Sequence, residues 1–212
     1  LTLIMKKNYP DLPYVLIGHS MGSYMSRKYA SIYGDELDGV IFLGTGNQPK
    51  AVVDSGLKLA HIAKLVRGER YRSELLNTIM FGAYNKRIKD NRTANDWLTK
   101  DTKIVDEYLS DPKCSYKFTA NAYIGFLNVI KYDIDKKNIA KTPDKLPVLF
   151  ASGIEDQVGD DGKGVKKAFK MYTKYVDNVE LYLYEDDRHE LHSETDREDI
   201  FSDLYEWIEE NV

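Results

Sequence analysis

The sequence contains a single cysteine and no long apolar run. Cys114 is the only cysteine among the 212 residues, so the chain can form neither an internal disulfide nor a metal site built on several cysteines. A lone cysteine mildly favours a reducing compartment, and we therefore expect a cytoplasmic protein. A membrane-spanning helix needs about 18 consecutive apolar residues, and the sequence has no such run.

A surplus of positive charge is also missing. The 30 Lys and Arg residues against 34 Asp and Glu give a formal net charge of −4, and the basic residues are scattered along the chain. Binding to nucleic acid requires a clustered basic surface, so we expect no nucleic-acid partner. With 42% hydrophobic and 30% charged residues, the composition is typical of a globular domain with its own core.

The first residues lack an initiator methionine and lack the order of a secretory signal peptide. Residues 1–7 place apolar side chains before two lysines, whereas a signal peptide begins with its basic segment. This stretch is typical of the last turns of a helix. We therefore expect that the sequence was cut from a longer protein, whose N-terminal half precedes Leu1.

Short apolar segments predict the strands of a sheet. Four of them have the composition of buried strands: residues 14–17, 40–43, 147–151 and 179–184. Helical periodicity follows the first, third and fourth, over residues 21–32, 164–175 and 200–208. The alternation of strands and helices predicts the α/β class, with a mostly parallel sheet covered by helices. Partial polar alternation in the fourth segment predicts an edge strand.

The stretch from residue 47 to residue 142 interrupts this alternation. It has helical periodicity and little strand character, with one helix predicted over residues 51–66. Thr99 or Asp101 is a candidate cap for a second helix, and Thr119 for a third. We therefore expect a sheet segment over 1–46, a helical insertion over 47–142 and a second sheet segment over 143–212. An insertion of this length is usually functional.

Residues 18–22, Gly-His-Ser-Met-Gly, match the G-x-S-x-G pattern of a nucleophile elbow. The pattern alone is weak, but here it follows a predicted buried strand and precedes an amphipathic helix, as an elbow requires. The tight turn would strain Ser20 and hold its hydroxyl above the edge of the sheet. Side chains at positions 18 and 22 would collide with neighbouring backbone, which explains both glycines.

Ser20 is therefore the candidate nucleophile. The start of the following helix would supply free N–H groups and a positive partial charge, so the N–H of Met21 is a candidate oxyanion donor. His19 is the variable residue of the motif, and we expect it to point away from the reaction. The competing interpretation is that Ser20 merely caps the helix, as serine often does.

A serine nucleophile needs a base within hydrogen-bonding reach and an acid that orients this base. In hydrolases with this elbow, the acid and then the base follow the serine along the chain, on loops after later strands. Asp156 follows the third predicted strand directly. Its order in the chain gives it only a modest lead over Glu155, Asp160 and Asp161, any of which is an equally ordinary solvated loop charge.

Among the histidines, His189 is the candidate base. It follows the fourth predicted strand directly, whereas His192 lies further along and has an ordinary surface interpretation. His61 falls inside a predicted helix of the insertion and before the acid, so we interpret it as structural. Parallel strands would bring the loops that carry the acid and His189 to the same edge of the sheet as Ser20.

The whole chain resembles the monoacylglycerol lipase and lysophospholipase-like branch of the α/β hydrolases, also called serine aminopeptidase-like. The matching segments are residues 18–23, 37–39, 96–98, 111–114, 152–156 and 188–190. The resemblance implies that Ser20, Asp156 and His189 form the triad and that the insertion is a helical cap over the site. It also implies an earlier half of the protein, with a His-Gly loop that supplies a second oxyanion N–H.

The sequence departs from this family pattern without losing a catalytic group. Gln157 stands where proline is often found after the acid, and Asp186–Asp187 stand where small residues often precede Arg-His. The resemblance implies hydrolysis of a carboxylic ester through an acyl-enzyme, with no metal or organic cofactor. The expected partner is a small-molecule fatty-acyl monoester, such as a monoacylglycerol or a lysophospholipid, and transient contact with a lipid surface would accompany its binding.

Apolar residues of the insertion fit an acyl pocket, although we expect most of them to form the insertion's own core: Met80, Phe81, Tyr84, Trp97, Tyr108, Phe118, Tyr123, Phe126 and Leu127. Two other functions stay open, a proline-type aminopeptidase with the same triad and a non-catalytic binding protein on the same scaffold. Dehalogenases and epoxide hydrolases are disfavoured, because they carry an aspartate nucleophile at the position of Ser20.

Overall fold

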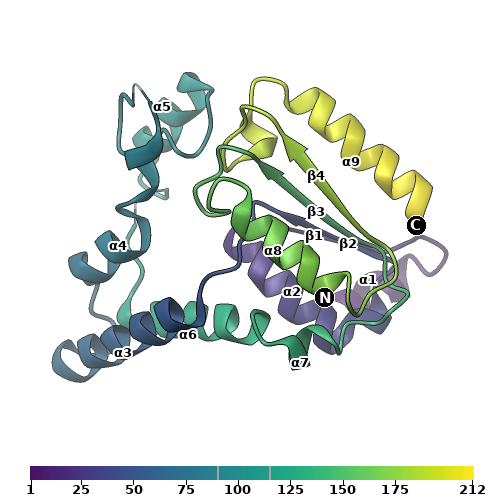
Figure 1. Cartoon of the computed structure of the whole chain (residues 1–212), viewed down its shortest axis with the longest axis horizontal. Helices are drawn as coiled ribbons and strands as arrows, with labels where there is room; N and C mark the ends of the chain where they lie inside the picture. Colours follow the sequence, from purple (N-terminus) through teal and green to yellow (C-terminus); the bar gives the residue numbers. More distant parts are fainter. Residues whose placement is uncertain (90, 115) are drawn as a thin grey trace.

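The computed structural model describes residues 1–89, 91–114 and 116–212. Its strands form one parallel sheet in the order β1 (Val15–His19), β2 (Gly39–Leu43), β3 (Val148–Gly153) and β4 (Val179–Tyr184). Each predicted strand is confirmed, and the sheet is parallel as expected (Figure 1). β4 lies at an edge of the described sheet and is partly exposed along its whole length, which agrees with its partial polar alternation.

Helices cover both faces of the sheet. Successive strand side chains point to opposite faces, so alternate residues of β2 and β3 meet different helices. One set packs with α2 (Met21–Tyr33) and α8 (Lys163–Tyr172): Val40, Phe42, Val148 and Phe150. The other set packs with α9 (Arg197–Asn211): Ile41, Leu43, Leu149 and Ala151. Burial on both faces explains why the sequences of these two strands are almost continuously apolar.

The remaining helices outside the insertion are short. α1 (Thr2–Asn8) precedes β1 and confirms the helix predicted at the start of the sequence. η1 (Gly34–Glu36) and η3 (Leu191–Ser193) are single turns that precede β2 and α9. Within the described ranges, no helix has both the length and the apolar character needed to cross a membrane.

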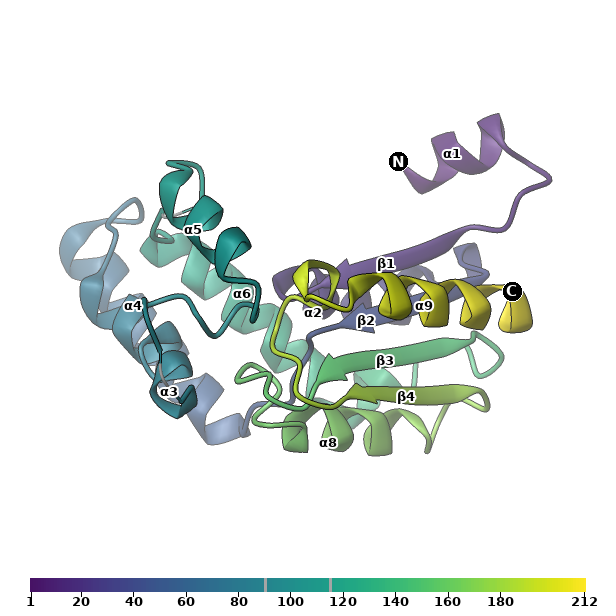
Figure 2. The same ribbon diagram turned by 90° about the horizontal axis from the view of Figure 1, so that it is seen from above.

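The insertion, residues 47–142, is helical in its described part. It contains α3 (Lys50–Arg67), α4 (Glu74–Phe81), η2 (Tyr84–Arg87), α5 (Thr102–Ser110), α6 (Ala120–Asp133) and α7 (Lys136–Ile139). α3 lies alongside α6, and α6 in turn contacts α2 of the sheet layer. The strands run toward the insertion, which therefore stands beyond their carboxyl ends (Figure 2).

Side-chain caps explain where the insertion helices begin. Asp101, rather than Thr99, caps α5 by accepting hydrogen bonds from N–H groups of its first turn. Thr119 caps α6 in the same way, as predicted. Ser73 caps α4, a helix that was not predicted although a serine before Leu-Leu and Ile-Met pairs is a usable signal.

A buried arginine joins the insertion to the sheet layer. Arg27 of α2 is only 1% exposed. Its Nη1 donates to the carbonyl of Gly46 at 2.8 Å, and its Nη2 donates to the carbonyl of Asp133 at 3.0 Å. Because an unpaired buried charge is costly, these bonds fix the guanidinium in place. They hold the end of α6 against the loop that follows β2.

Candidate active site

Ser20 lies in a sharp turn between β1 and α2. Its backbone angles, φ 54° and ψ −120°, fall in a region that residues other than glycine rarely occupy. Its N–H donates to the carbonyl of Leu43 at 3.0 Å, which ties the turn to the end of β2. Ser20 holds the N-cap position of α2, but its side chain makes no capping hydrogen bond. The interpretation of Ser20 as a simple helix cap therefore has no hydrogen bond to support it.

The two glycines of the motif differ in how closely they are packed. A Cβ on Gly18 would lie 2.3 Å from Oγ of Ser26 and 2.5 Å from the carbonyl oxygen of Gly22. The predicted collision is thus confirmed at Gly18. At Gly22 the prediction is wrong, because a Cβ there would meet no described atom within 4 Å beyond the local helix backbone. Gly22 lies in the first turn of α2, where the added atom would point into open space.

Asp156 and His189 form a buried pair at the carboxyl ends of β3 and β4. Nδ1 of His189 is 3.0 Å from Oδ1 of Asp156, and the two residues are 1% and 0% exposed. Oδ1 also accepts from the N–H of Val158 at 2.8 Å, and Oδ2 accepts from the hydroxyl of Ser152 at 3.2 Å. The structure therefore brings these two predicted residues together and satisfies both oxygens of the carboxylate.

The competing acids of the same loop lie elsewhere. Asp160 and Asp161 both accept from Nη1 of Arg87, at 3.0 Å and 2.6 Å, on the exposed side of the loop. Glu155 faces the guanidinium of Arg188, with its Oε2 3.7 Å from Nε. None of these three carboxylates contacts the imidazole of a histidine among the described residues.

The surroundings of Asp156 favour its ionised form. Burial acts to raise the pKa of this carboxyl, but the adjacent His189 and the hydrogen bonds from His189, Val158 and Ser152 outweigh burial, and the pKa lies below its usual value. An ionised carboxylate can only accept, so Nδ1 of His189 carries the hydrogen in the neutral ring. Nε2 is then the basic nitrogen. It is buried and has no hydrogen-bond partner in the part of the chain that the structure describes.

Ser20 and His189 line the same cavity, so the third predicted residue opens onto the same space as the Asp156–His189 pair. Because Nε2 of His189 has no partner among the described residues, the hydroxyl of Ser20 is not hydrogen-bonded to it in this conformation. Such bonds are often long in ligand-free enzymes and tighten when substrate binds. Met21 is the first residue of α2, where helical geometry leaves the N–H without an acceptor inside the helix.

His19 packs against His189, and the expectation that it points away from the reaction is wrong. The two rings have centroids 4.8 Å apart, and Nε2 of His19 is 3.1 Å from the carbonyl oxygen of His189. A carbonyl only accepts, so this nitrogen is the donor. Burial, and then the charges of His189 and His192, lower the pKa of His19 to about 3. His192 is exposed and meets His19 edge-on, whereas His61 is exposed on α3.

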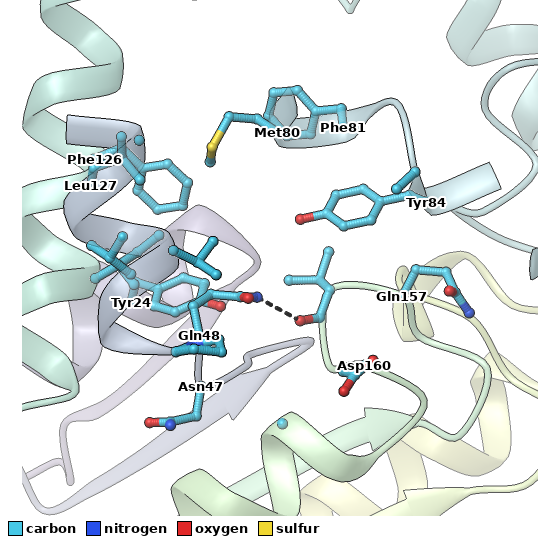
Figure 3. Close-up of a pocket in the computed structure, with 18 of the residues that line it drawn as sticks. Tyr24, Asn47, Gln48, Met80, Phe81, Tyr84, Phe126, Leu127, Gln157 and Asp160 are labelled. Carbon is cyan, nitrogen blue, oxygen red and sulfur yellow. Dashed lines mark hydrogen bonds between the residues drawn. The ribbon is translucent and has the colours of Figure 1, made fainter. Parts of the chain in front are cut away.

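A largely apolar cavity of about 450 Å³ opens at Ser20. Figure 3 shows its apolar wall, which comes from the insertion: Met80, Phe81, Phe126 and Leu127. Loops after β2 and β3 supply a more polar wall with Asn47, Gln48 and Gln157. We call this space the first cavity. Its mostly apolar lining suits an apolar ligand group.

A second cavity of about 610 Å³ also reaches Ser20, and His189 is part of its wall. It contains more polar and charged side chains: Asn77, Asn95, Lys113, Lys117 and Glu190. Trp97 lines both cavities, and its ring centroid is 5.2 Å from that of His189. Ser20 is therefore flanked by an apolar space and a more polar space, with Trp97 between them.

The apolar residues proposed for an acyl pocket contribute more to the cavities than expected. Of the candidates named above, all except the fully buried Tyr123 line the first or the second cavity. Most of them also belong to the hydrophobic cluster of the insertion. The expectation that most of them form the core of the insertion is confirmed, and the same side chains also form the cavity wall.

Two residues that shape the histidine site were missed. Gly44 has φ 55°, and a Cβ there would lie 3.0 Å from Nδ1 and Cε1 of His189, so any side chain would press on the imidazole. A glycine directly after a buried strand was the available signal. Glu194 is 0% exposed although an acid in a polar loop usually indicates a solvated charge, and no sequence signal distinguishes it.

Metal-ligating side chains do not cluster within residues 1–89, 91–114 and 116–212: no group of three or more His, Cys, Asp or Glu there could hold a metal ion. Cys114 is a free, partly buried thiol that lines the second cavity.

Two solved structures have folds similar to that of this chain. The carboxyl esterase of Bacillus coagulans, solved in complex with glycerol, superposes with a TM-score of 0.91 at 27% identity, over 100% of this chain and 69% of that chain. A soluble variant of the monoglyceride lipase of Saccharomyces cerevisiae gives a TM-score of 0.74 at 22% identity, over 100% and 68%. The second likeness shows the fold alone.

Sequence comparison agrees with the fold. The monoglyceride lipase homolog of Monkeypox virus is 22% identical over 206 residues, which cover 96% of this chain and 66% of that protein. The chain thus spans just under two thirds of the length of this curated relative. The family described as "Serine aminopeptidase, S33" matches residues 1–196. The chain belongs to this family, among the α/β hydrolases that are similar to monoglyceride lipases.

Proposed function

We propose that the whole protein is a serine hydrolase of carboxylic esters, in which Ser20 is the nucleophile, His189 the base and Asp156 the orienting acid. The observation that carries this proposal is the buried Asp156–His189 pair: Nε2 of His189 has no hydrogen-bond partner among the described residues, and His189 lines a cavity that Ser20 also lines. Membership of a hydrolase family supports the reaction class. Relatives named as a carboxyl esterase and as monoglyceride lipases favour an ester bond.

The proposed reaction has two acyl-transfer steps. Nε2 of His189 takes the proton of the Ser20 hydroxyl as its oxygen attacks the ester carbonyl, and the imidazolium then protonates the leaving alcohol. Water attacks the acyl-enzyme in the second step, with the same nitrogen as base. The carboxylate of Asp156 holds the tautomer and stabilises the charged ring, which its 3.0 Å contact with Nδ1 allows.

The N–H of Met21 is the proposed donor to the oxyanion. It stands at the N-terminus of α2, where the helix dipole adds a positive partial charge. Reaction at Ser20 would develop a negative charge on the carbonyl oxygen within reach of this end. The strained φ of Ser20 fixes the hydroxyl relative to that N–H, so little rearrangement would be needed on the way to the transition state.

The two cavities suggest which parts of a substrate go where. The acyl chain of a monoacylglycerol or lysophospholipid would occupy the first cavity, against Met80 and Phe126. The alcohol would occupy the second cavity, near Asn95. Exposed apolar side chains on α3, such as Leu65 at 86% and Val66 at 70%, support transient contact with a lipid surface from which such a substrate would be drawn.

Active-site labelling and turnover test the proposal directly. A fluorophosphonate probe should label the whole protein at Ser20, and Ser20→Ala should abolish this labelling. The same substitution should lower kcat/KM for acylglycerols with two to sixteen acyl carbons by roughly 10⁴-fold or more. Ser31→Ala is the matched control, because Ser31 lies at the far end of the same helix. Labelling of Ser20→Ala equal to that of the wild type would refute the assignment of the nucleophile.

An aminopeptidase remains the second candidate function, because the carboxylate of Glu190 lies in the wall of the second cavity and would attract an ammonium group. Prolyl and glycyl arylamides should be assayed beside the esters. Higher kcat/KM on prolyl amides would replace the ester proposal. A folded protein that neither labels nor turns over any of these compounds would instead indicate a binding function for the same cavities.

A further inference from the structure

The last part of the insertion loop before α5 is docked on the loop that carries His189. We call residues 96–100 the docking segment and residues 185–194 the histidine loop. The N–H of Glu190 donates to the carbonyl of Leu98 at 2.7 Å. Nη1 of Arg188 donates to the carbonyls of Asp96 and Thr99, at 2.7 Å and 3.1 Å. Both chain neighbours of His189 are thus hydrogen-bonded to the docking segment.

Glu194, the last residue of the histidine loop, also binds the docking segment. Its Oε1 accepts from the N–H of Arg188 at 2.8 Å, inside the loop. Its Oε2 accepts from the hydroxyl of Thr99 at 2.9 Å and from the N–H of Lys100 at 3.0 Å, both in the docking segment. The residue is 0% exposed. A buried carboxylate is costly unless donors meet its charge, and here donors from both segments do so.

The docking segment also contains Trp97, whose ring lies against the imidazole of His189. The ring centroids of Trp97 and His189 are 5.2 Å apart, and the planes are inclined by 36°. The ring of His19, 4.8 Å away, Oδ1 of Asp156 and the backbone of Gly44 also lie against His189. One neighbour of the base therefore belongs to the insertion. The bonds described above hold the backbone on both sides of Trp97, and its own N–H donates to Oδ1 of Asn85 at 3.0 Å.

We propose that Glu194 is a positioning residue for His189, because it fastens the docking segment to the histidine loop and so keeps Trp97 against the imidazole. The proposal rests on the proposed function, because it takes His189 as the catalytic base. Glu194 does not touch the reacting atoms. It acts through Arg188 and the docking segment. The orientation of His189 therefore depends on the contact between the docking segment and the histidine loop.

Kinetics on the whole protein separate positioning from mere stabilisation. In Glu194→Ala we expect kcat for ester hydrolysis to fall roughly 10- to 100-fold, since small misplacements of catalytic groups have effects of this size, while KM stays within about threefold. All active sites should still label with fluorophosphonate, but more slowly. Glu194→Gln keeps one acceptor oxygen instead of two, so kcat should fall to an intermediate value.

Glu180→Ala is the matched control. Glu180 in β4 also uses a carboxylate oxygen to accept from a buried donor, Nε1 of Trp207 at 2.9 Å, but it contacts neither the docking segment nor the histidine loop among the described hydrogen bonds. It should lower the melting temperature and leave kcat per labelled site unchanged. Equal kcat per labelled site in Glu194→Ala and the wild type would overturn the proposal.

Trp97 gives a readout that does not depend on catalysis. The 212 residues contain two tryptophans, so Trp207→Phe leaves Trp97 as the sole reporter among them, and a Trp97→Phe variant measures the signal of any tryptophan outside them. In this background Glu194→Ala should increase the quenching of Trp97 by acrylamide. If the wild type failed to hydrolyse esters but Trp97 responded in this way, the proposed function would fall and the docking role of Glu194 would stand. Unchanged quenching would overturn the docking role, whatever the activity.

Discussion

The sheet and the insertion contribute to the same site in different ways. The sheet layer holds Ser20, Asp156 and His189 at the ends of its strands, on a frame whose β2 and β3 are completely buried. The insertion supplies most of the apolar cavity wall and joins the sheet layer through the packing of α6 on α2 and through polar contacts such as those of Arg27 and Glu194. In the proposed function, the ends of the strands would therefore supply the catalytic groups, and the helices of the insertion would determine which acyl chains fit.

The largest expected effect comes from changing the charge in the sheet layer. Asp156→Asn should lower kcat roughly 10³- to 10⁴-fold, because the imidazolium of His189 loses its counter-charge and its fixed tautomer. The loss of stability should be moderate: an amide whose nitrogen faces Nδ1 of His189 also faces the N–H of Val158 and so loses that hydrogen bond, while the hydroxyl of Ser152 can donate to the amide oxygen. Steady-state kinetics and urea unfolding measure the two effects. A large loss of stability with unchanged kcat would mean that Asp156 is only structural.

A smaller and more selective effect is expected from the insertion. Met80→Trp should lower kcat/KM for dodecanoyl esters by roughly 10- to 100-fold and leave acetyl esters nearly unchanged, because the larger ring fills the first cavity where Met80 points into it (Figure 3). The assay is a series of esters of increasing acyl length.

Ile62→Trp is the control for bulk, since Ile62 is 58% exposed on α3 and is not part of the cavity wall. If Met80→Trp reduced turnover of all chain lengths equally, the first cavity would not be the acyl site. The contrast with Asp156→Asn is the direct test of the division between the two regions. One change should act on every ester and the other only on long ones.

Prediction from sequence succeeded where one local pattern determines the structure. The strands follow from buried apolar runs, and the strained turn at Ser20 follows from a glycine motif between a strand and a helix. It failed where the answer depends on distant neighbours. Whether Gly22 has room for a side chain, and where the ring of His19 points, are set by packing that no spacing reveals.

The dependence on distant neighbours also explains why the cavity wall of the insertion and the burial of Glu194 were not predicted. Its aromatic residues were identifiable, but a helical period does not distinguish a ring in a core from a ring in a cavity wall, and here rings such as Phe81 do both. Glu194 illustrates the limit for charge. Two of its three donors lie in the docking segment, 95 and 94 positions earlier, so an acid that looks solvated in the sequence is buried in the fold.

The smallest expected effect concerns Asp187, a buried carboxylate of the sheet layer. Unlike Asp156, it does not have hydrogen-bond donors at both oxygens among the described residues. Asp187 is 3% exposed, and its Oδ2 has no hydrogen-bond partner among the described residues. Burial, and then the nearby charges of Glu194 and Asp196, raise its pKa to about 6. The folded state then binds more protons than the unfolded state between about pH 4 and pH 6, so the wild type loses stability as the pH rises through this window.

Asp187→Asn removes this loss, because the amide stays neutral at every pH. The variant should be more stable than the wild type by about 1 kcal/mol at pH 7.5, a value reduced by solvent screening near the loop, and the gain should vanish near pH 4. Urea unfolding at the two pH values measures it. Asp186→Asn is the control: Asp186 is exposed with φ 64°, a conformation that asparagine tolerates. An equal gain for Asp187→Asn at both pH values would show that packing, and not the buried charge, limits stability at this end of the sheet.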